Sequence, residues 1–320
     1  MNVPENETKR IAVVFPGQGS QKPGMGKEFY EQIPVCKETY EEASDTLGWD
    51  VSSLCFGEDE RLNLTEYTQP CIVTTEIAML RGLSKRYGFA PELFGGHSLG
   101  EFTALVAAGV MPLAETLKIV QTRGKLMQIA VPVGVGGMAA VISEGIDIAV
   151  LRNLMEDLPV DIANINSEHQ VVISGQASAL PEVEKRLTQT LTPEKPFRFV
   201  PLNVSAPFHS RFMKSIENNF SHTLKEVGKD LRPQKAPQVT SNFTGGFHSE
   251  NVVEIRENLV NQISNTVHWR ENMLSLATKA KEIYEVGPGR PLRDFFKTIG
   301  VTCQSITGLA AAEKGFACAT

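Results

Sequence analysis

The segment Gly96-His97-Ser98-Leu99-Gly100 constrains the fold more than any other part of the sequence. It follows a short apolar run, Leu93–Gly95, and precedes an Ala- and Leu-rich run, Glu101–Gly109, so it predicts a sharp turn between a buried strand and a helix. The two glycines let the strand and the helix approach closely, which leaves Ser98 exposed at the helix N-terminus. There the helix dipole and the free N–H groups favour negative charge. The alternative is a Gly-flanked turn with an unreactive serine, because G-x-S-x-G also occurs by chance.

Strand and helix patterns alternate along most of the chain and predict an α/β protein with a mainly parallel sheet and helices on both faces. Short strands are expected at Ile11–Phe15, Leu93–Gly95, Val239–Asn242 and Glu282–Val286. Amphipathic patterns predict helices at Lys27–Leu47, Thr68–Tyr87, Glu101–Gly109, Leu113–Met127, Phe212–Val227 and Glu254–Ser264. The last residues, Ala310–Thr320, are expected to fray.

A different order of elements occupies residues 134–205. Strands are expected at Gly137–Ile142, Val160–Asn164, Gln170–Ser174 and Phe197–Leu202, and helices at Ile146–Glu156 and Leu180–Thr190. The resulting βαββαβ order is the ferredoxin-like pattern. We therefore expect a compact subdomain, 134–205, inserted into a discontinuous core made of 1–133 and 206–320.

A serine nucleophile needs a base, and the chain has six histidines. They are His97, His169, His209, His222, His248 and His268. His209 is favoured because it lies in a loop between a predicted strand and a predicted helix, where catalytic groups collect. His97 adjoins Ser98 in the turn and is expected to point elsewhere and brace it. From the residues alone, a histidine chosen in this way is more often structural than catalytic.

A second Gly-rich segment, Gly17-Gln18-Gly19-Ser20-Gln21, follows the first predicted strand. It lacks the Gly-Lys-Ser/Thr of a phosphate-binding P-loop and the G-x-G-x-x-G of a dinucleotide site. Its glycines would let backbone N–H groups approach an oxyanion, with the Gln18 N–H as one donor. A plain turn between strand and helix is the alternative, and by itself this segment favours it.

Composition excludes several classes of protein. The net charge of -6 argues against broad nucleic-acid binding, which usually requires a basic excess. The five cysteines are odd in number, widely spaced and without a CxxC, which favours reduced thiols over disulfides or a zinc site. The N-terminus has no apolar signal region, and the longest apolar stretch, Ile129–Ile142, is too short to span a membrane. We expect a cytoplasmic protein without a membrane segment.

Five motifs occur together in order and at a characteristic spacing. They are Gly17–Gln21, Gly96–Glu101, Gln121–Gly124, Pro207–Ser210 and Glu285–Gly289. Together they resemble the malonyl-CoA:acyl carrier protein transacylases, the stand-alone acyltransferases of fatty-acid synthesis and of trans-acyltransferase polyketide synthesis. The resemblance covers about Ile11 to Ile299 and implies an α/β-hydrolase-like core with an inserted ferredoxin-like subdomain.

The resemblance also assigns roles to residues. It implies that Ser98 is the nucleophile, that His209 is its base, and that the N–H groups of Gln18 and Leu99 form the oxyanion hole. Arg123 matches the arginine that grips the free carboxylate of malonyl, which suits the planar fork of a guanidinium. Gln262 matches the position whose main-chain carbonyl orients the histidine, so no triad aspartate is needed. Asn164 and Asn166 match an Asn-rich segment near the entrance of the site, but no role is assigned to them. Glu101 is expected to be structural.

The activity implied is transfer of malonyl from malonyl-CoA, through a seryl ester, to the phosphopantetheine thiol of an acyl carrier protein, with ping-pong kinetics. No permanently bound cofactor or metal is expected, and the resemblance suggests a monomer. The basic residues Lys185, Arg186 and Arg198 are candidates for docking the carrier. Two alternatives remain open: an acyl-thioester hydrolase on the same scaffold, and a non-catalytic docking subunit of a synthase.

The sequence departs from the commonest fatty-acid pattern at two positions. Phe102 stands where tyrosine is usual, and Phe208 stands where serine is common. A phenylalanine directly before the histidine resembles polyketide-type acyltransferases that select malonyl over methylmalonyl, because the ring would crowd an α-methyl group. One methyl group is worth only about 1–3 kcal/mol in a pocket, so the expected preference is incomplete.

Overall fold

Four parallel strands form the central sheet of the computed structural model, which describes residues 10–191 and 196–316. Their order is β2-β1-β7-β8, and every pairing between neighbours is parallel. The strands are β1 (Ile11–Phe15), β2 (Leu93–Gly96), β7 (Glu282–Val286) and β8 (Cys303–Ile306). The predicted parallel sheet is confirmed, and β8 is an edge strand that the sequence patterns did not predict.

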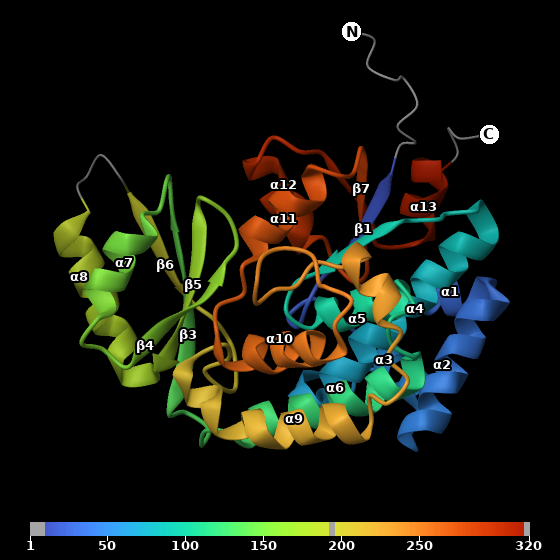
Figure 1. The fold of residues 1–320 in the computed structure, drawn as a ribbon, viewed down its shortest axis with the longest axis horizontal. Coiled ribbons are helices and arrows are strands. Elements are labelled where there is room, and N and C mark those ends of the chain that lie inside the picture. Colours follow the sequence, from blue (N-terminus) through green and yellow to red (C-terminus); the bar gives the residue numbers. More distant parts are fainter. Residues whose placement is uncertain (1–9, 192–195, 317–320) are drawn as a thin grey trace, which may run out of the picture.

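Helices cover both faces of this sheet (Figure 1). Alternate residues of β1 point to opposite faces, so Val13 and Phe15 join one apolar cluster while Ala12 and Val14 join another. The first cluster is covered by α2 (Pro34–Leu47), α4 (Thr65–Tyr87), α5 (Gly100–Ala107) and α6 (Leu113–Ile129). The second is covered by α11 (Trp269–Ala277) and α12 (Pro291–Thr298). The α/β class is therefore confirmed.

A second, antiparallel sheet has the order β4-β5-β3-β6. Its strands are β3 (Gly136–Ser143), β4 (Val160–Ile165), β5 (Gln170–Gln176) and β6 (Phe197–Pro201). Helices α7 (Ile148–Met155) and α8 (Leu180–Thr190) cover one face through an apolar cluster of their own. This is the predicted ferredoxin-like order, whereas the exact boundaries at 134 and 205 stay a prediction.

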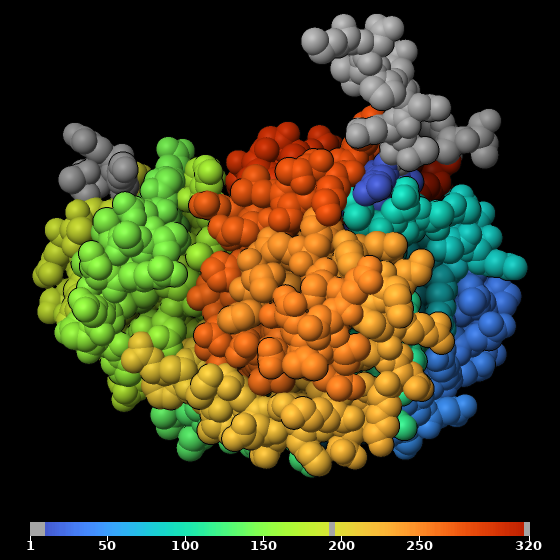
Figure 2. Space-filling view, viewed as in Figure 1, coloured from blue at the N-terminus to red at the C-terminus, as the bar shows by residue number. Residues whose placement is uncertain are grey.

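The two sheets are joined by a short backbone link. Val267, just before α11, forms a parallel bridge with Asn164 on β4, with N–O distances of 3.0 Å and 2.8 Å to the neighbours of Asn164. The Thr266 hydroxyl donates to the Ile162 carbonyl at 2.7 Å. In Figure 2 the green surface of the antiparallel sheet and its helices lies directly against the orange and red surface of the larger part.

Three predicted elements are wrong in detail. The helix predicted at Lys27–Leu47 is two helices, α1 (Lys27–Gln32) and α2, because Ile33 precedes a proline and is extended. The helix predicted at Phe212–Val227 begins as a 3₁₀ turn, η3 (Arg211–Ile216), before α9 (Glu217–Glu226). Val239–Asn242 makes only isolated bridges, from Val239 to Phe94 and from Thr240 to Phe247.

The remaining elements complete the fold. Helix α4 begins three residues earlier than predicted, so Pro70 lies inside it. The other elements are α3 (Val51–Phe56), η1 (Glu60–Asn63), η2 (Ala177–Ala179), η4 (Pro233–Gln238), α10 (Val252–Ser264) and α13 (Leu309–Phe316). Part of the stretch that was expected to fray is therefore helical, and 317–320 lie outside the described residues.

The cysteines and the helix lengths add two findings. Cys36, Cys55, Cys71 and Cys303 are buried, and none forms a disulfide within the described ranges; Cys318 lies outside them. Burial raises the pKa of the Cys36 thiol to about 12, which keeps it protonated and unreactive. No helix in the described part of the chain is long and apolar enough to cross a membrane.

Candidate active site

Ser98 lies in a tight turn between β2 and α5. Its φ is 51°, in the left-handed region that a non-glycine residue rarely adopts. The flanking glycines are required by close backbone contact: a Cβ on Gly96 would lie 2.0 Å from the Gly100 carbonyl carbon, and one on Gly100 would lie 2.2 Å from the Phe15 oxygen. The turn therefore packs α5 against the ends of β1 and β2, as the sequence pattern predicted, and it holds the serine in a strained conformation.

The Ser98 hydroxyl meets the imidazole of His209. Ser98 Oγ lies 2.7 Å from His209 Nε2, and the opposite ring nitrogen, Nδ1, lies 2.7 Å from the main-chain oxygen of Gln262. Because a carbonyl can only accept, the Nδ1 atom carries the proton, and Nε2 is free to accept from the serine. Burial and the nearby Arg123 charge lower the pKa of His209 to about 3, so the ring is neutral at pH 7.

Arg123 is a buried cation beside the serine. Its side chain is 1% exposed, and its Nη2 atom lies 3.2 Å from Ser98 Oγ. The guanidinium also donates to Gln69 Oε1 at 3.1 Å and to Gln262 Oε1 at 2.8 Å, and it stacks 5.4 Å from the centre of the Phe102 ring. Burial lowers its pKa to about 10, so it remains charged at pH 7.

The partners of Arg123 are unusual for a buried charge. They are amides and a hydroxyl, and no carboxylate in the described residues lies within ion-pair distance of the guanidinium. The Nε atom has no partner among these residues. A buried cation normally has an anionic partner, so the arrangement leaves room for a carboxylate supplied by a ligand.

The predicted oxyanion hole consists of the backbone N–H groups of Gln18 and Leu99. Neither the Gln18 N–H nor the Leu99 N–H has an acceptor among the residues that the structure describes. Gly17 brings the first segment close to the turn, because a Cβ there would lie 2.5 Å from the His97 oxygen. Both donors are therefore unpaired, and their role stays a prediction.

A cavity of about 970 Å³ opens onto Ser98 between the two sheets. From the core, its walls include Gln18, Arg123 and Phe208; from the antiparallel sheet, they include Asn164, Asn166 and Arg198. His97 also lines the cavity, and its Nε2 atom lies 2.8 Å from Asn166 Oδ1 rather than on the serine hydroxyl.

The three basic residues considered for docking do not form one group at the cavity. Only Arg198 lines this cavity. Arg186 pairs with Asp157 and Glu182, and Lys185 also pairs with Glu182, on the outer helices of the antiparallel sheet (Figure 1).

A buried polar network that the sequence did not predict lies beneath the site. Glu101 is fully buried and accepts from the Asn242 N–H at 2.9 Å, from Gln262 Nε2 at 2.7 Å and from His248 Nε2 at 2.8 Å. Asn242 in turn accepts from the Ser98 N–H at 2.6 Å. The only sequence signal for Asn242 is its position at the end of the strand predicted at Val239–Asn242.

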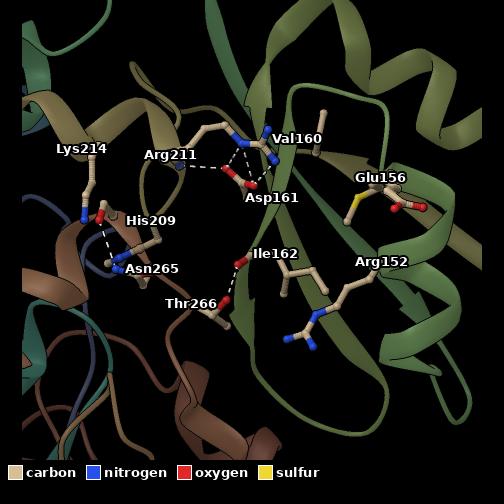
Figure 3. A pocket seen from close by; sticks show the side chains of 12 residues that line it. Arg152, Glu156, Val160, Asp161, Ile162, His209, Arg211, Lys214, Asn265 and Thr266 are labelled. Atoms are coloured by element: carbon tan, nitrogen blue, oxygen red, sulfur yellow. Dashed lines mark hydrogen bonds and ion pairs between the residues drawn. The ribbon is translucent and has the colours of Figure 1, made fainter.

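A second cavity, of about 570 Å³, is also lined by His209, together with residues of β4, of α7 and of the segments after His209 and α10. Figure 3 shows its lining side chains. Arg211 and Asp161 point toward each other there: the Arg211 N–H donates to Asp161 at 2.8 Å and its guanidinium at 2.6 Å. This pair links the loop after His209 to β4. No three His, Cys, Asp or Glu side chains within 10–191 and 196–316 are grouped to hold a metal ion.

Known proteins resemble this chain over nearly its whole length. The acyl transferase domain model matches residues 12–288. The malonyl CoA-acyl carrier protein transacylase of Bacillus subtilis is 37% identical over 304 residues, 93% of this chain and 92% of that protein.

Two solved structures show the same fold. A malonyl CoA-acyl carrier protein transacylase from Clostridium perfringens superposes with a TM-score of 0.88 at 33% identity, covering 97% of both chains. A malonyl-transacylase in complex with its type II PKS acyl-carrier protein superposes with a TM-score of 0.87 at 33% identity, covering 96% of this chain and 99% of that one. The chain therefore belongs to the acyl transferase domain family and, within it, to the malonyl CoA-acyl carrier protein transacylases.

Proposed function

We propose that this chain transfers a malonyl group from malonyl-CoA to the phosphopantetheine thiol of an acyl carrier protein, through an ester on Ser98. The observation that carries the proposal is Arg123, a buried cation 3.2 Å from Ser98 Oγ that lacks an anionic partner among the described residues. An acyl group that bears a free carboxylate, as malonyl does, supplies that partner. A neutral acyl group gains nothing from a buried guanidinium.

In the first half-reaction, His209 Nε2 takes the proton of the Ser98 hydroxyl as Oγ attacks the thioester carbonyl. The negative oxygen of the tetrahedral intermediate accepts from the N–H groups of Gln18 and Leu99. Loss of one such donor typically lowers the rate by about 100- to 1000-fold. The intermediate then collapses, the C–S bond breaks, and His209 returns the proton to the CoA thiolate, which leaves a malonyl ester on Ser98.

The second half-reaction reverses these steps with a different thiol. His209 takes the proton of the phosphopantetheine thiol, sulfur attacks the ester, and Ser98 leaves with the proton. The Gln262 carbonyl keeps the ring in the reactive tautomer in both halves. Arg123 holds the malonyl carboxylate, and Phe208 forms part of the wall of the same cavity.

The proposed reaction needs no resident cofactor, because the CoA thioester is a substrate and the phosphopantetheine arrives on the carrier protein. We further propose that the chain acts in the cytoplasm as a monomer and that 134–205 behave as an inserted subdomain. The first of these rests on the composition and the N-terminal sequence, the second on the family resemblance, and the third on the order of the elements together with that resemblance.

The acyl-enzyme provides the direct test. Wild-type protein mixed with malonyl-CoA should gain the mass of one malonyl group, and Ser98→Ala should gain none. Ser205→Ala is the matched control, because Ser205 lines the same cavity and donates to Gln128 rather than to the histidine. An adduct on Ser98→Ala would refute the assignment of the nucleophile.

The fate of the adduct separates the alternatives. A transferase passes the malonyl group to an added holo carrier protein, and a hydrolase releases free malonate at the same rate with or without the carrier. A docking subunit forms no adduct at all.

A further inference from the structure

Glu101 is a buried carboxylate to which the proposed reaction gives no task. It lies in the first turn of α5 and is 0% exposed. Its Oε2 atom accepts two hydrogen bonds, from the Asn242 N–H and from Gln262 Nε2, and its Oε1 atom accepts one from His248 Nε2. Asn242 and Gln262 each go on to contact the reacting groups.

The Asn242 side chain holds the strained turn. Its Oδ1 atom accepts from the Ser98 N–H at 2.6 Å, and its Nδ2 atom donates to the Gly96 carbonyl at 2.7 Å. A left-handed conformation at a non-glycine residue is unfavourable and persists only where the surroundings hold it. Asn242, positioned by Glu101, supplies two of the bonds that do so.

The Gln262 side chain reaches the arginine. Its Nε2 atom donates to Glu101 and to the Ser98 carbonyl, and its Oε1 atom accepts from Arg123 at 2.8 Å. An amide presents donors at one end and an acceptor at the other. Because a carboxylate can only accept, Glu101 determines that the oxygen of Gln262 faces the guanidinium.

The spacing of the two charges also matters. Burial lowers the pKa of Arg123, and the charge of Glu101 offsets this in part, but the Gln262 amide lies between the two side chains. A carboxylate in direct contact would occupy the donors that a substrate carboxylate needs. One amide in between stabilises the cation and leaves donors available.

We propose that Glu101 is a positioning residue for the acyl transfer: through Asn242 it holds the turn that carries Ser98, and through Gln262 it orients Arg123 toward the carboxylate of the acyl group. The inference rests on the proposed function. It predicts that the charge on Glu101 affects carboxylated acyl groups more than neutral ones.

Glu101→Gln preserves the size of the side chain and removes the charge. The Gln262 amide is then free to turn its NH2 group toward Arg123, so we expect malonyl transfer to fall about tenfold in kcat/KM, as for the loss of one hydrogen bond to a charged group. Acetyl transfer, which does not use Arg123, should fall much less. Glu76→Gln is the matched control, since Glu76 is also fully buried but accepts from Thr103 and not from the site.

A double-variant cycle follows the route through Gln262. Gln262→Met removes the side-chain amide and retains the main-chain carbonyl that orients His209. In that background, Glu101→Gln should have no further effect on the malonyl-to-acetyl ratio. Asn242→Ala should slow the transfer of malonyl and of acetyl equally, because Asn242 holds the turn that carries Ser98 and both reactions use Ser98. Melting temperatures identify any variant that fails to fold.

Two outcomes would overturn the inference. In the first, folded Glu101→Gln retains the wild-type ratio of malonyl to acetyl transfer. In the second, the effects of Glu101→Gln and Gln262→Met on that ratio are additive. Failure of the proposed function is a separate result, because in that case the wild-type protein itself forms no malonyl ester on Ser98.

Discussion

Burial acts on both residues that flank the Ser98 hydroxyl, and in each it produces the state that acyl transfer needs. It lowers the pKa of His209 to about 3, which leaves a neutral ring able to accept a proton. It lowers the pKa of Arg123 only to about 10, which leaves a cation able to bind a carboxylate. The difference arises because the unperturbed values of the two groups start so far apart.

Replacement of Arg123 by alanine should separate two substrates. We expect kcat/KM for malonyl-CoA to fall about 100-fold, because a bidentate contact with a carboxylate is lost, while that for acetyl-CoA stays the same or rises. Transfer of both groups to a carrier protein is measured by mass. Lys125→Ala is the control, an exposed cation on the same helix. An equal loss for both substrates would show that Arg123 does not contact the carboxylate.

The low pKa of His209 predicts activity in acid. A histidine with an unperturbed pKa of about 6.5 would lose roughly 30-fold of its base form between pH 7 and pH 5. With a pKa of about 3, the base form persists, so the rate of Ser98 acylation should be nearly the same at both pH values. Rapid mixing with malonyl-CoA, quenching at set times and mass measurement of the protein give this rate. An acylation rate that falls with a midpoint near pH 6.5 would contradict the prediction.

The same pKa affects stability. Between about pH 3 and pH 6.5 the unfolded chain binds a proton at His209 that the folded chain does not, so the free energy of unfolding falls as pH falls through this window. The contribution is at most about 1.4 kcal/mol per pH unit. Urea unfolding of His209→Asn should show a shallower loss between pH 6.5 and pH 5 than the wild type, and identical slopes would contradict the assignment.

At the scale of elements, the junction of β2 and α5 has the least tolerance for change. A Cβ on Gly96 would lie 2.0 Å from the backbone of Gly100, which no rotation of a side chain relieves. Helix α5 would have to move away from β1 and β2, and Ser98 with it. The close approach explains why both glycines of the motif are needed for this geometry.

Gly96→Ala should therefore lower stability by about 1–3 kcal/mol, the usual range for an overpacked site, and slow the acylation of Ser98. Thermal unfolding and adduct formation measure the two effects. Gly246→Ala is the control, since nothing lies within 4 Å of the added Cβ there. Equal melting temperatures for the two variants would count against the packing argument.

At the scale of the whole molecule, the site depends on contact between the two sheets. The cavity at Ser98 takes walls from both, and the loop carrying His209 is tied to β4 by Arg211 and Asp161 (Figure 3). His209 itself has a φ of 57°, which is a strained conformation for a non-glycine residue. The hydrogen bond from the Arg211 N–H to Asp161 helps to hold this conformation.

Asp161→Ala should affect activity more than stability. Ion pairs with exposed partners contribute about 0–1 kcal/mol, so the melting temperature should change little. Acylation of Ser98 should slow several-fold, because the loop that carries His209 loses its acceptor. Glu182→Ala removes an acceptor of Arg186 on the outer helices and serves as the control. Acylation of Asp161→Ala at the wild-type rate would contradict the proposed link.

Much of this protein was predictable from local sequence. The period of apolar residues predicted most strands and helices to within a turn, and the order of elements predicted both sheets. Two glycines around Ser98 predicted the sharp turn between strand and helix, whereas the strained φ of Ser98 came only from the structure. These features depend on residues that are near neighbours along the chain, where propensity and spacing act directly.

Other features were decided only by tertiary structure. Asn242 meets Ser98 across 144 positions and Gln262 meets Glu101 across 161, and such pairs depend on how the whole chain packs. A strand was predicted at Val239–Asn242, but within the described part this segment makes only isolated bridges. Local sequence can place Ser98 in a turn and Glu101 in the helical turn that follows, but only packing brings a base and a cation to the serine, because His209 comes from a distant loop and Arg123 from α6.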